Sequence, residues 1–208
     1  MRNTPDLLFR ETMSGPLAPG AWDPLHGEHA GHATPFTLHS TLRIDSLEAF
    51  LGDPSHEARL EGEVSFPPFG DRLPVLHGSF QLFSPTEDPG MRLMRYGVTF
   101  AHAQREYFLA GTKFLQDAPG SNLWRETTRL YSTLHEGPSN RGPVVGAGVL
   151  TIGVSGFLQL LASLRAPRGG AETVVRFGQF FLGNLWDLYA RLPEVWPVRF
   201  APSRTPWD

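Results

Sequence analysis

Lys113 is the only lysine of the chain, and it lies in the middle of an alternating segment, between Gly111 and Leu115. A lysine that points into an apolar interior has a lowered pKa, because burial disfavours its charged form. Such a lysine could form a Schiff base, transfer a proton or neutralise the carboxylate of a ligand. The alternative is a lysine on the solvent face or paired with a carboxylate, since lysines are seldom buried.

Further polar and aromatic residues could accompany Lys113. His77, Tyr96, Tyr131 and His135 lie within segments of alternating polarity. They could be the few convergent polar groups of an otherwise apolar pocket, or ordinary half-exposed strand residues. His77 or a tyrosine could transfer protons together with Lys113. The candidate catalytic residues are therefore Lys113 and His77, and the candidate ligand-binding residues are Tyr96, Lys113, Trp124, Tyr131 and His135.

The densest set of potential metal ligands is the stretch His26-Gly27-Glu28-His29-Ala30-Gly31-His32. Three imidazoles and a carboxylate could hold zinc or iron. The stretch is predicted to be a loop, however, and nothing nearby is expected to orient the imidazoles. We therefore predict a solvent-exposed, histidine-rich turn, with no metal and no cofactor.

The composition excludes several classes of protein. The chain of 208 residues has no cysteine, which excludes disulfides, thiolate nucleophiles and cysteine-based metal sites. Its formal net charge of -3 argues against a nucleic-acid partner. No nucleophile elbow, Walker loop, dinucleotide fingerprint or His-Glu-x-x-His motif occurs. Without a long apolar run or an apolar leader, we expect no membrane span and a cytoplasmic location.

Alternation of apolar and polar residues predicts the strands that must position these side chains. Turns rich in glycine, proline and aspartate separate the strands, and a short helix is expected after a capping box at Asp45 to Glu48. Apolar residues at helical spacing predict a further helix over 157–164. Residues 174–177 could form another strand, although the residues after them favour a helix. The predicted strands are 36–44, 58–66, 73–83, 92–101, 106–116, 126–135 and 144–152.

These strands predict a mainly β fold. No helix of crossover length lies between residues 58 and 152, which excludes parallel winding there. The simplest arrangement is an antiparallel up-and-down β-barrel of about eight strands, similar to lipocalins and other calycins, with C-terminal helices. A curved open sheet around the C-terminal helix is the competing geometry. Residues 1–35 are predicted to be an irregular arm packed on the barrel, and residues 36–208 a single β-barrel domain with C-terminal helices.

Several stretches of the chain resemble a known domain. Phe9 to Gly15 reads Phe-Arg-Glu-Thr-Met-Ser-Gly, in which Arg10 and Glu11 could simply pair locally. With later stretches, it resembles a domain found beside or fused to bacterial glucose–methanol–choline-type flavin oxidoreductases of the cholesterol-oxidase kind. The resemblance implies a lipid or sterol context, but the chain lacks the flavin-binding fingerprint and is not itself the oxidase. The later stretches are 66–68, 78–83, 94–96, 111–113, 123–131 and 145–150.

Three functions fit these expectations. The first is binding of an apolar small molecule, such as a lipid, a sterol or a polyketide, in the barrel, as an accessory to a flavin oxidoreductase. The second is a cofactor-independent isomerase or cyclase that acts on a lipid-like substrate. The third is a structural interaction module that docks a larger protein or forms a homodimer.

Overall fold

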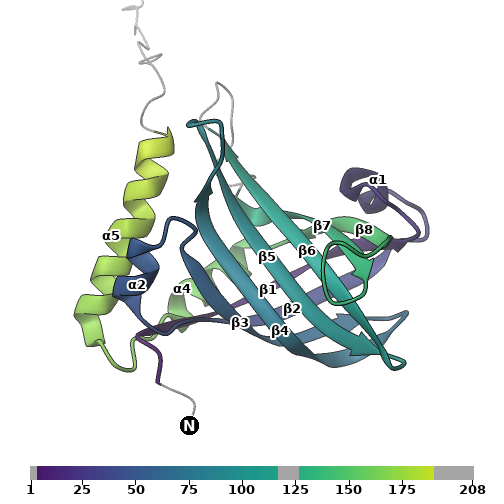
Figure 1. Ribbon diagram of the computed structural model, residues 1–208, viewed down its shortest axis with the longest axis horizontal. Coiled ribbons are helices and arrows are strands. Elements are labelled where there is room, and N and C mark those ends of the chain that lie inside the picture. Colours follow the sequence, from purple (N-terminus) through teal and green to yellow (C-terminus); the bar gives the residue numbers. More distant parts are fainter. Residues whose placement is uncertain (1–3, 117–126, 190–208) are drawn as a thin grey trace, which may run out of the picture.

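The computed structural model describes residues 4–116 and 127–189, and its centre is a closed barrel of eight antiparallel strands (Figure 1). Each strand pairs with the next along the chain, and β1 pairs with β8 to close the barrel. The fold class predicted from the sequence is confirmed. The strands are β1 Leu7–Pro19, β2 Thr34–Ile44, β3 Glu57–Phe66, β4 Gly70–Pro85, β5 Met91–His102, β6 Arg105–Gln116, β7 Arg129–Glu136 and β8 Val144–Thr151.

All seven predicted strands are present, as β2 to β8. Their alternation arises because successive side chains of a strand point to opposite faces of the sheet. In β2, for example, Phe36, Leu38 and Leu42 are buried in the barrel, whereas His39 between them is exposed. Closure leaves the sheet without free edges.

The eighth strand is β1, which lies where an irregular arm was predicted. Leu7, Phe9 and Met13 of β1 are buried at alternate positions, as in the other strands. The prolines that argued against a strand are accommodated, because Pro16 lies opposite Pro35 and neither residue has a backbone N–H to donate. The predicted irregular arm at residues 1–35 is therefore wrong for the described part of this segment, because Leu7–Pro19 belongs to the barrel wall.

Two glycines let β1 and β8 approach each other where the barrel closes. A Cβ atom at Gly15 would lie 2.1 Å from the Val149 carbonyl oxygen, and one at Gly148 would lie 2.0 Å from the Pro16 carbonyl oxygen. Neither position has room for a side chain.

One end of the barrel is filled by aromatic rings, which we call the aromatic plug. Phe100 lies at its centre, with ring centroids 6.2 Å from Phe36, 6.4 Å from Phe69 and 6.1 Å from Tyr107. Phe66 completes the plug, 5.4 Å from Phe36 and 5.2 Å from Phe69. Tilted and edge-on ring pairs at these distances add to the stabilisation that comes from burying their area.

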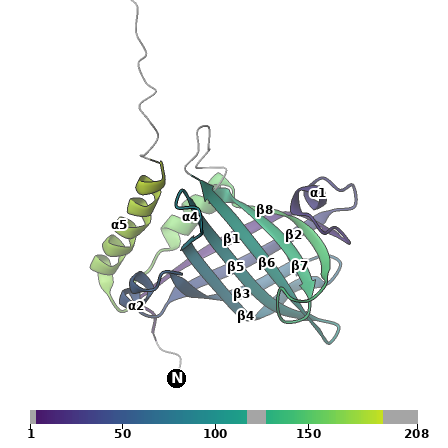
Figure 2. The same cartoon turned by 45° about the horizontal axis from the view of Figure 1, so that its top comes forward.

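Three helices gather at the opposite end of the barrel: α2 Leu47–Gly52, α4 Val154–Ser163 and α5 Gly170–Tyr189 (Figure 2). Another helix, α1 Pro24–Glu28, packs beside β8 at the other end. Residues 174–177, which could have been a strand, belong to α5. Among the described residues, no helix has the length and apolar character that a membrane span requires.

Helix α5 rests on the barrel through phenylalanines from several elements. Phe177 lies 6.0 Å from Phe9 of β1, and Phe180 lies 5.8 Å from Phe50 of α2, measured between ring centroids. Phe181 lies 5.4 Å from Phe83 of β4. Phe83 has a φ of +55° at an irregularity in the β4–β5 pairing, and both it and the preceding Leu82 are buried. The bulge therefore turns an otherwise outward residue towards α5.

Candidate functional site

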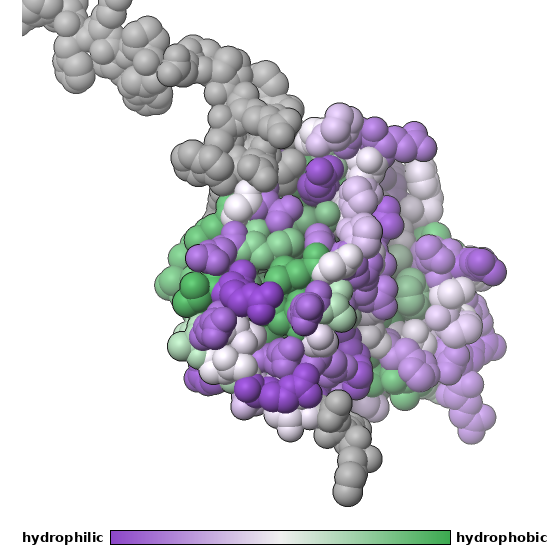
Figure 3. Space-filling model, turned by 60° about the vertical axis from the view of Figure 1, so that its left-hand side comes forward, coloured by the Kyte–Doolittle hydropathy of each residue, from purple (hydrophilic) through white to green (hydrophobic). Residues whose placement is uncertain are grey.

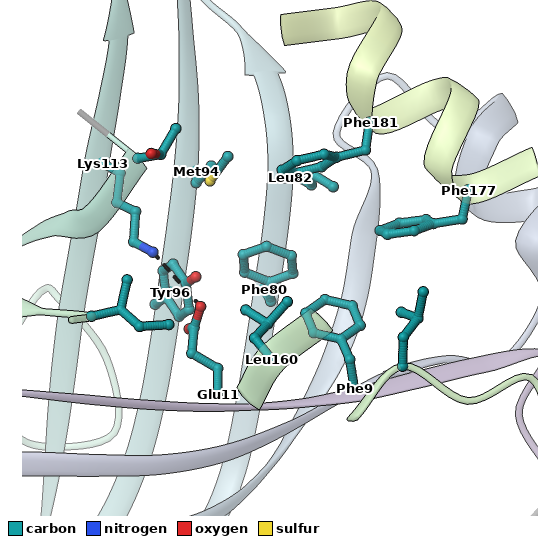
Figure 4. A pocket seen from close by; sticks show the side chains of 13 residues that line it. Phe9, Glu11, Phe80, Leu82, Met94, Tyr96, Lys113, Leu160, Phe177 and Phe181 are labelled. Carbon is teal, nitrogen blue, oxygen red and sulfur yellow. Dashed lines mark ion pairs between the residues drawn. The ribbon is translucent and has the colours of Figure 1, made fainter. Parts of the chain in front are cut away.

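A cavity of about 90 Å³ lies between the barrel interior and the helices α4 and α5 (Figure 4). Strands β1, β4, β5 and β6 supply its inner wall, and the two helices cover it. Among the described residues, its lining is apolar apart from four side chains, those of Glu11, Tyr96, Lys113 and Thr127. The apolar lining consists of Phe9, Phe80, Leu82, Met94, Ile152, Leu160, Leu164, Phe177 and Phe181.

Glu11 and Lys113 form an ion pair inside this cavity. The Lys113 Nζ lies 3.8 Å from the Glu11 Oε2, and the two side chains are only 3% and 4% exposed. Glu11 comes from β1 and Lys113 from β6, which are not neighbouring strands, so the pair spans the barrel interior. Closure of the barrel is what brings the two charges together.

Tyr96 of β5 completes this polar cluster, as Figure 4 shows. The Lys113 Nζ lies 5.1 Å from the centroid of the Tyr96 ring, within the range of a cation–π contact. Burial raises the pKa of the Tyr96 phenol well above its usual value, and the neighbouring Glu11 carboxylate raises it further. Tyr96 is therefore a protonated phenol at neutral pH.

Burial has the opposite effect on Lys113. Loss of hydration lowers the pKa of the Lys113 ammonium, and the Glu11 carboxylate only partly offsets that effect. The structure thus combines two of the alternatives considered for this lysine: it is buried, and it is paired with a carboxylate. Its charge is already matched by Glu11, so the suggestion that Lys113 neutralises a ligand carboxylate loses its basis.

The two oxygens of Glu11 differ in their surroundings. Oε2 faces Lys113, whereas Oε1 is buried and has no hydrogen-bond partner in the described part of the chain. A buried carboxylate oxygen without a donor costs about 1–3 kcal/mol or more. Native structures rarely leave such an atom without a protein, water or ion partner.

Of the other candidate residues, three lie away from the cavity. His77 of β4 is exposed, beyond a register shift between Val75 and His77. Tyr131 of β7 packs its ring against Phe114 on the outer face of the barrel, at 5.8 Å. His135 bonds to the Thr133 hydroxyl and to the Gly142 carbonyl group.

The positions of these residues have a common cause. Leu130, Ser132 and Leu134 are the inward residues of β7, so Tyr131 and His135 must point outward. Alternation alone does not tell which face is the inside. His77 is therefore not placed to act with Lys113, and Tyr131 and His135 are not placed to touch a molecule in the cavity. The predicted ligand contact Trp124 lies outside the described residues.

Sequence reasoning missed Glu11 as a member of this site. Local pairing of Arg10 with Glu11 was one interpretation of this stretch, but Arg10 is exposed and Glu11 is buried. The signal was present in the spacing, because Glu11 lies two residues from both Phe9 and Met13. In a strand these three residues must share one face, which places a carboxylate among buried apolar residues.

The histidine-rich stretch is partly helical and is not a loop throughout. Asp23 caps α1 by accepting a hydrogen bond from the His26 backbone N–H. Glu28 pairs with Arg129 of β7 at 2.6 Å, and a ring nitrogen of His32 lies 3.1 Å from the Pro19 carbonyl oxygen. Among the residues that the structure describes, no group of three or more potential ligands is arranged to hold a metal ion.

The outer surface at the cavity end carries apolar side chains between polar ones (Figure 3). Leu158 and Leu161 of α4 and Leu182 of α5 are each more than half exposed. None of the three is among the residues that line the cavity. The helices that cover the cavity therefore also present apolar side chains to the surface.

Comparison of the chain with known proteins gives no match to a protein-family model, to a curated protein or to a solved structure. The resemblance to a domain associated with flavin oxidoreductases stays a prediction. A function must therefore be argued from the cavity and its polar cluster.

Proposed function

We propose that the barrel binds an apolar small molecule, such as a lipid, a sterol or a polyketide, in the cavity beneath α4 and α5. One observation carries the proposal: in the part of the chain that the structure describes, an apolar cavity of the barrel contains a buried cluster of polar side chains. Ligand sites commonly combine apolar walls with a few polar groups that orient the bound molecule. Here the apolar walls would hold the body of the ligand, and Glu11, Tyr96 and Lys113 would set its direction.

The cavity is small, so binding of a large molecule requires that the covering side chains move. An engineered apolar cavity of about 150 Å³ takes up benzene, whereas this cavity measures about 90 Å³. A molecule as large as a sterol would therefore have to displace Phe177 and Phe181, which cover the cavity from α5. We expect α5 to move outward on binding, because it is fastened to the barrel by ring contacts along one face.

Entry by outward movement of α5 also agrees with the proposed accessory role. A domain that stands beside a flavin oxidoreductase would exchange an apolar substrate or product with that enzyme. The exchange would take place at the helix-covered end, where the cavity is nearest to the surface. This part of the proposal depends on the sequence resemblance alone.

A cofactor-independent isomerase or cyclase is the second candidate, and the polar cluster favours it. A protonated phenol and a carboxylate in one apolar cavity form the kind of acid–base pair that proton transfer requires. Glu11 would accept a proton from the substrate and Tyr96 would donate one. Binding without any change in the bound molecule would exclude this candidate.

Two experiments test the binding proposal. Native mass spectrometry of the purified protein should reveal a co-purified apolar molecule. Titration with the neutral apolar dye N-phenyl-1-naphthylamine should show saturable uptake. An unliganded protein that also fails to take up the dye would contradict the proposal.

A pair of tryptophan variants on α4 locates the uptake. Leu160→Trp places a large ring at a half-buried position that lines the cavity, and dye affinity should fall at least about tenfold. Leu161→Trp places the same ring on the exposed side of the helix and is the matched control. Equal dye binding by both variants would show that the dye binds elsewhere.

A further inference from the structure

The unpartnered oxygen of Glu11 restricts what the bound molecule can present to it. Both ends of the Glu11–Lys113 pair are buried, yet only Oε2 has a partner among the described residues. Oε1 can accept hydrogen bonds but cannot donate one while the carboxylate is ionised. A molecule that satisfies Oε1 must therefore bring a hydrogen-bond donor.

The charges around Oε1 limit that donor further. Glu11 and Lys113 carry opposite charges, so the pair is neutral as a whole. A ligand carboxylate would add a negative charge beside Glu11, and an ammonium group would add a positive charge beside Lys113. Either would leave an unmatched charge in a cavity from which water is largely excluded, which is costly.

Uncharged acceptor groups fit no better. An ether, ester or ketone oxygen would place its lone pairs against those of Oε1 and leave both without a proton. A hydroxyl group supplies the proton and carries no charge. Its own oxygen could in turn accept a hydrogen bond from a donor in the cluster.

The shape of the cavity sets the direction of the molecule. Figure 4 shows the polar cluster at one end and Phe177 and Phe181 of α5 at the other, with Phe9 and Leu160 between them. A hydroxyl bound at Glu11 therefore points into the barrel. The apolar body of the molecule then extends towards α4 and α5.

We infer that the ligand is an apolar alcohol, a fatty alcohol or a hydroxylated polycycle, whose hydroxyl group donates a hydrogen bond to Glu11 Oε1. The inference rests on the proposed binding function and specifies the chemical class that the site selects. An alcohol thus takes the place of a carboxylic acid, which was the ligand class that Lys113 alone suggested.

Matched probes test this selection by displacement of N-phenyl-1-naphthylamine. Dodecan-1-ol is compared with its methyl ether and with dodecanoate, and cholesterol is compared with its methyl ether as a second skeleton. A hydrogen bond to a charged acceptor should make the better-fitting alcohol bind about ten- to a hundredfold more tightly than its ether. Dodecanoate should bind more weakly than dodecan-1-ol.

A double variant tests whether Glu11 causes the preference. Glu11→Leu combined with Lys113→Met removes the acceptor and leaves no lone charge in the cavity. This variant should still take up the dye but should bind each alcohol and its ether equally. Arg72→Met with Glu63→Leu, which removes an exposed ion pair on the barrel surface, is the control and should keep the preference.

The outcomes separate this inference from the proposed function. Dye uptake by the wild type, with the ether or dodecanoate binding as tightly as the alcohol, overturns the inference and leaves the binding function in place. Dye uptake without displacement by either alcohol also overturns it, as does a preference that persists in the double variant. Failure of the protein to take up the dye, an apolar alcohol or a co-purified molecule overturns the proposed function itself.

Discussion

The two ends of the barrel are built from the same alternating strands but have opposite interiors. At one end Phe36, Phe66 and Phe100 are fully buried and pack ring against ring with Phe69 and Tyr107. At the other end the same inward positions include Glu11 and Lys113, beside a cavity covered by helices. The interior is thus solid at the aromatic plug and hollow and charged under α4 and α5.

This difference separates stability from function within one barrel. The rings of the plug gain apolar burial and dispersion contacts without any cost of charge burial. The cavity end is less stabilised, because the Glu11–Lys113 ion pair is removed from water and the Glu11 Oε1 has no hydrogen-bond partner among the described residues. Proteins commonly accept such a cost where a site must remain ready to bind. Changes at the plug should therefore affect folding, and changes at the cavity should affect binding.

The largest expected effect is at the plug. Phe100→Ala removes the central ring and should reduce the free energy of unfolding by about 4 kcal/mol, because the surrounding rings cannot collapse into the space. Equilibrium unfolding in urea, followed by tryptophan fluorescence, measures the loss. Phe114→Ala, on the exposed face of β6, is the control and should cost less than about 1 kcal/mol. If the two variants unfold alike, the plug is not the stabilising end.

A slightly smaller effect is expected from breaking the buried ion pair. Lys113→Met leaves Glu11 as a single charge in the apolar cavity and should cost about 3 kcal/mol at neutral pH. Adding Glu11→Leu should recover most of that loss, since the double variant buries no charge. Urea unfolding of both variants and the wild type completes the comparison. Single and double variants of equal stability would show that the charges are not coupled.

An intermediate effect on stability, combined with a gain in binding, is expected at α5. Phe181→Ala removes a half-buried ring that contacts Phe83 and should cost about 1.5 kcal/mol, less than loss of a fully buried ring. It also enlarges the cavity, so N-phenyl-1-naphthylamine should bind several-fold more tightly. Leu182→Ala changes the exposed neighbouring position and should affect neither quantity. Weaker dye binding by Phe181→Ala would mean that the ring is part of the binding surface and does not act as a cover.

The smallest effect concerns the attachment of the helices, and it depends on pH. Asp6 accepts hydrogen bonds of 2.8 Å from the Leu47 backbone N–H and from the Arg168 Nε, which join β1, α2 and the segment before α5. The bond from Leu47 is the main cause that lowers the pKa of Asp6 below its ordinary value of 3.8, while burial opposes it and Arg168 assists it. Asp6→Asn should cost about 1 kcal/mol at pH 7.

The pH dependence of that cost follows from the direction of the shift. A carboxyl group with a lowered pKa in the folded state contributes its full stabilisation above the pKa of the unfolded chain. The contribution is lost as the pH falls through the lower, folded-state pKa. The difference between wild type and Asp6→Asn should therefore be constant from pH 6 to pH 8 and shrink below about pH 4. The exposed Glu106→Gln is the control, and a difference that does not shrink at all below about pH 4 would contradict this role for Asp6.

Much of the barrel could be predicted from the sequence, because alternation is a local property of the chain. The alternation of apolar and polar residues in segments such as 36–44 and 106–116 predicts strands without information from the rest of the molecule. Residues 7–19 escaped prediction for a local reason as well: Glu11 interrupts the apolar face, and Pro16 and Pro19 are poor strand residues. Only pairing with β2 and β8 shows that this segment completes the barrel.

The candidate site was likewise predicted only in part. Lys113 and Tyr96 were expected to belong to it, and both lie in the cavity. His77, Tyr131 and His135 are also polar residues within alternating segments, but they lie outside the cavity. Their positions could not be predicted, because no local rule tells which face of a strand points into the barrel. A bulge in β4, which turns Phe83 towards α5, is likewise invisible in the spacing of the residues.

The sequence by itself determined strands β2 to β8, their short connections and hence their antiparallel order, because backbone geometry fixes these over a few residues. Only the tertiary structure decided which side chains meet. Glu11 and Lys113 are 102 positions apart and come from strands that do not pair, so their contact exists only when β1 closes the barrel against β8. The chemistry of the cavity depends on that long-range closure, since one charge without the other would not be stable in an apolar interior.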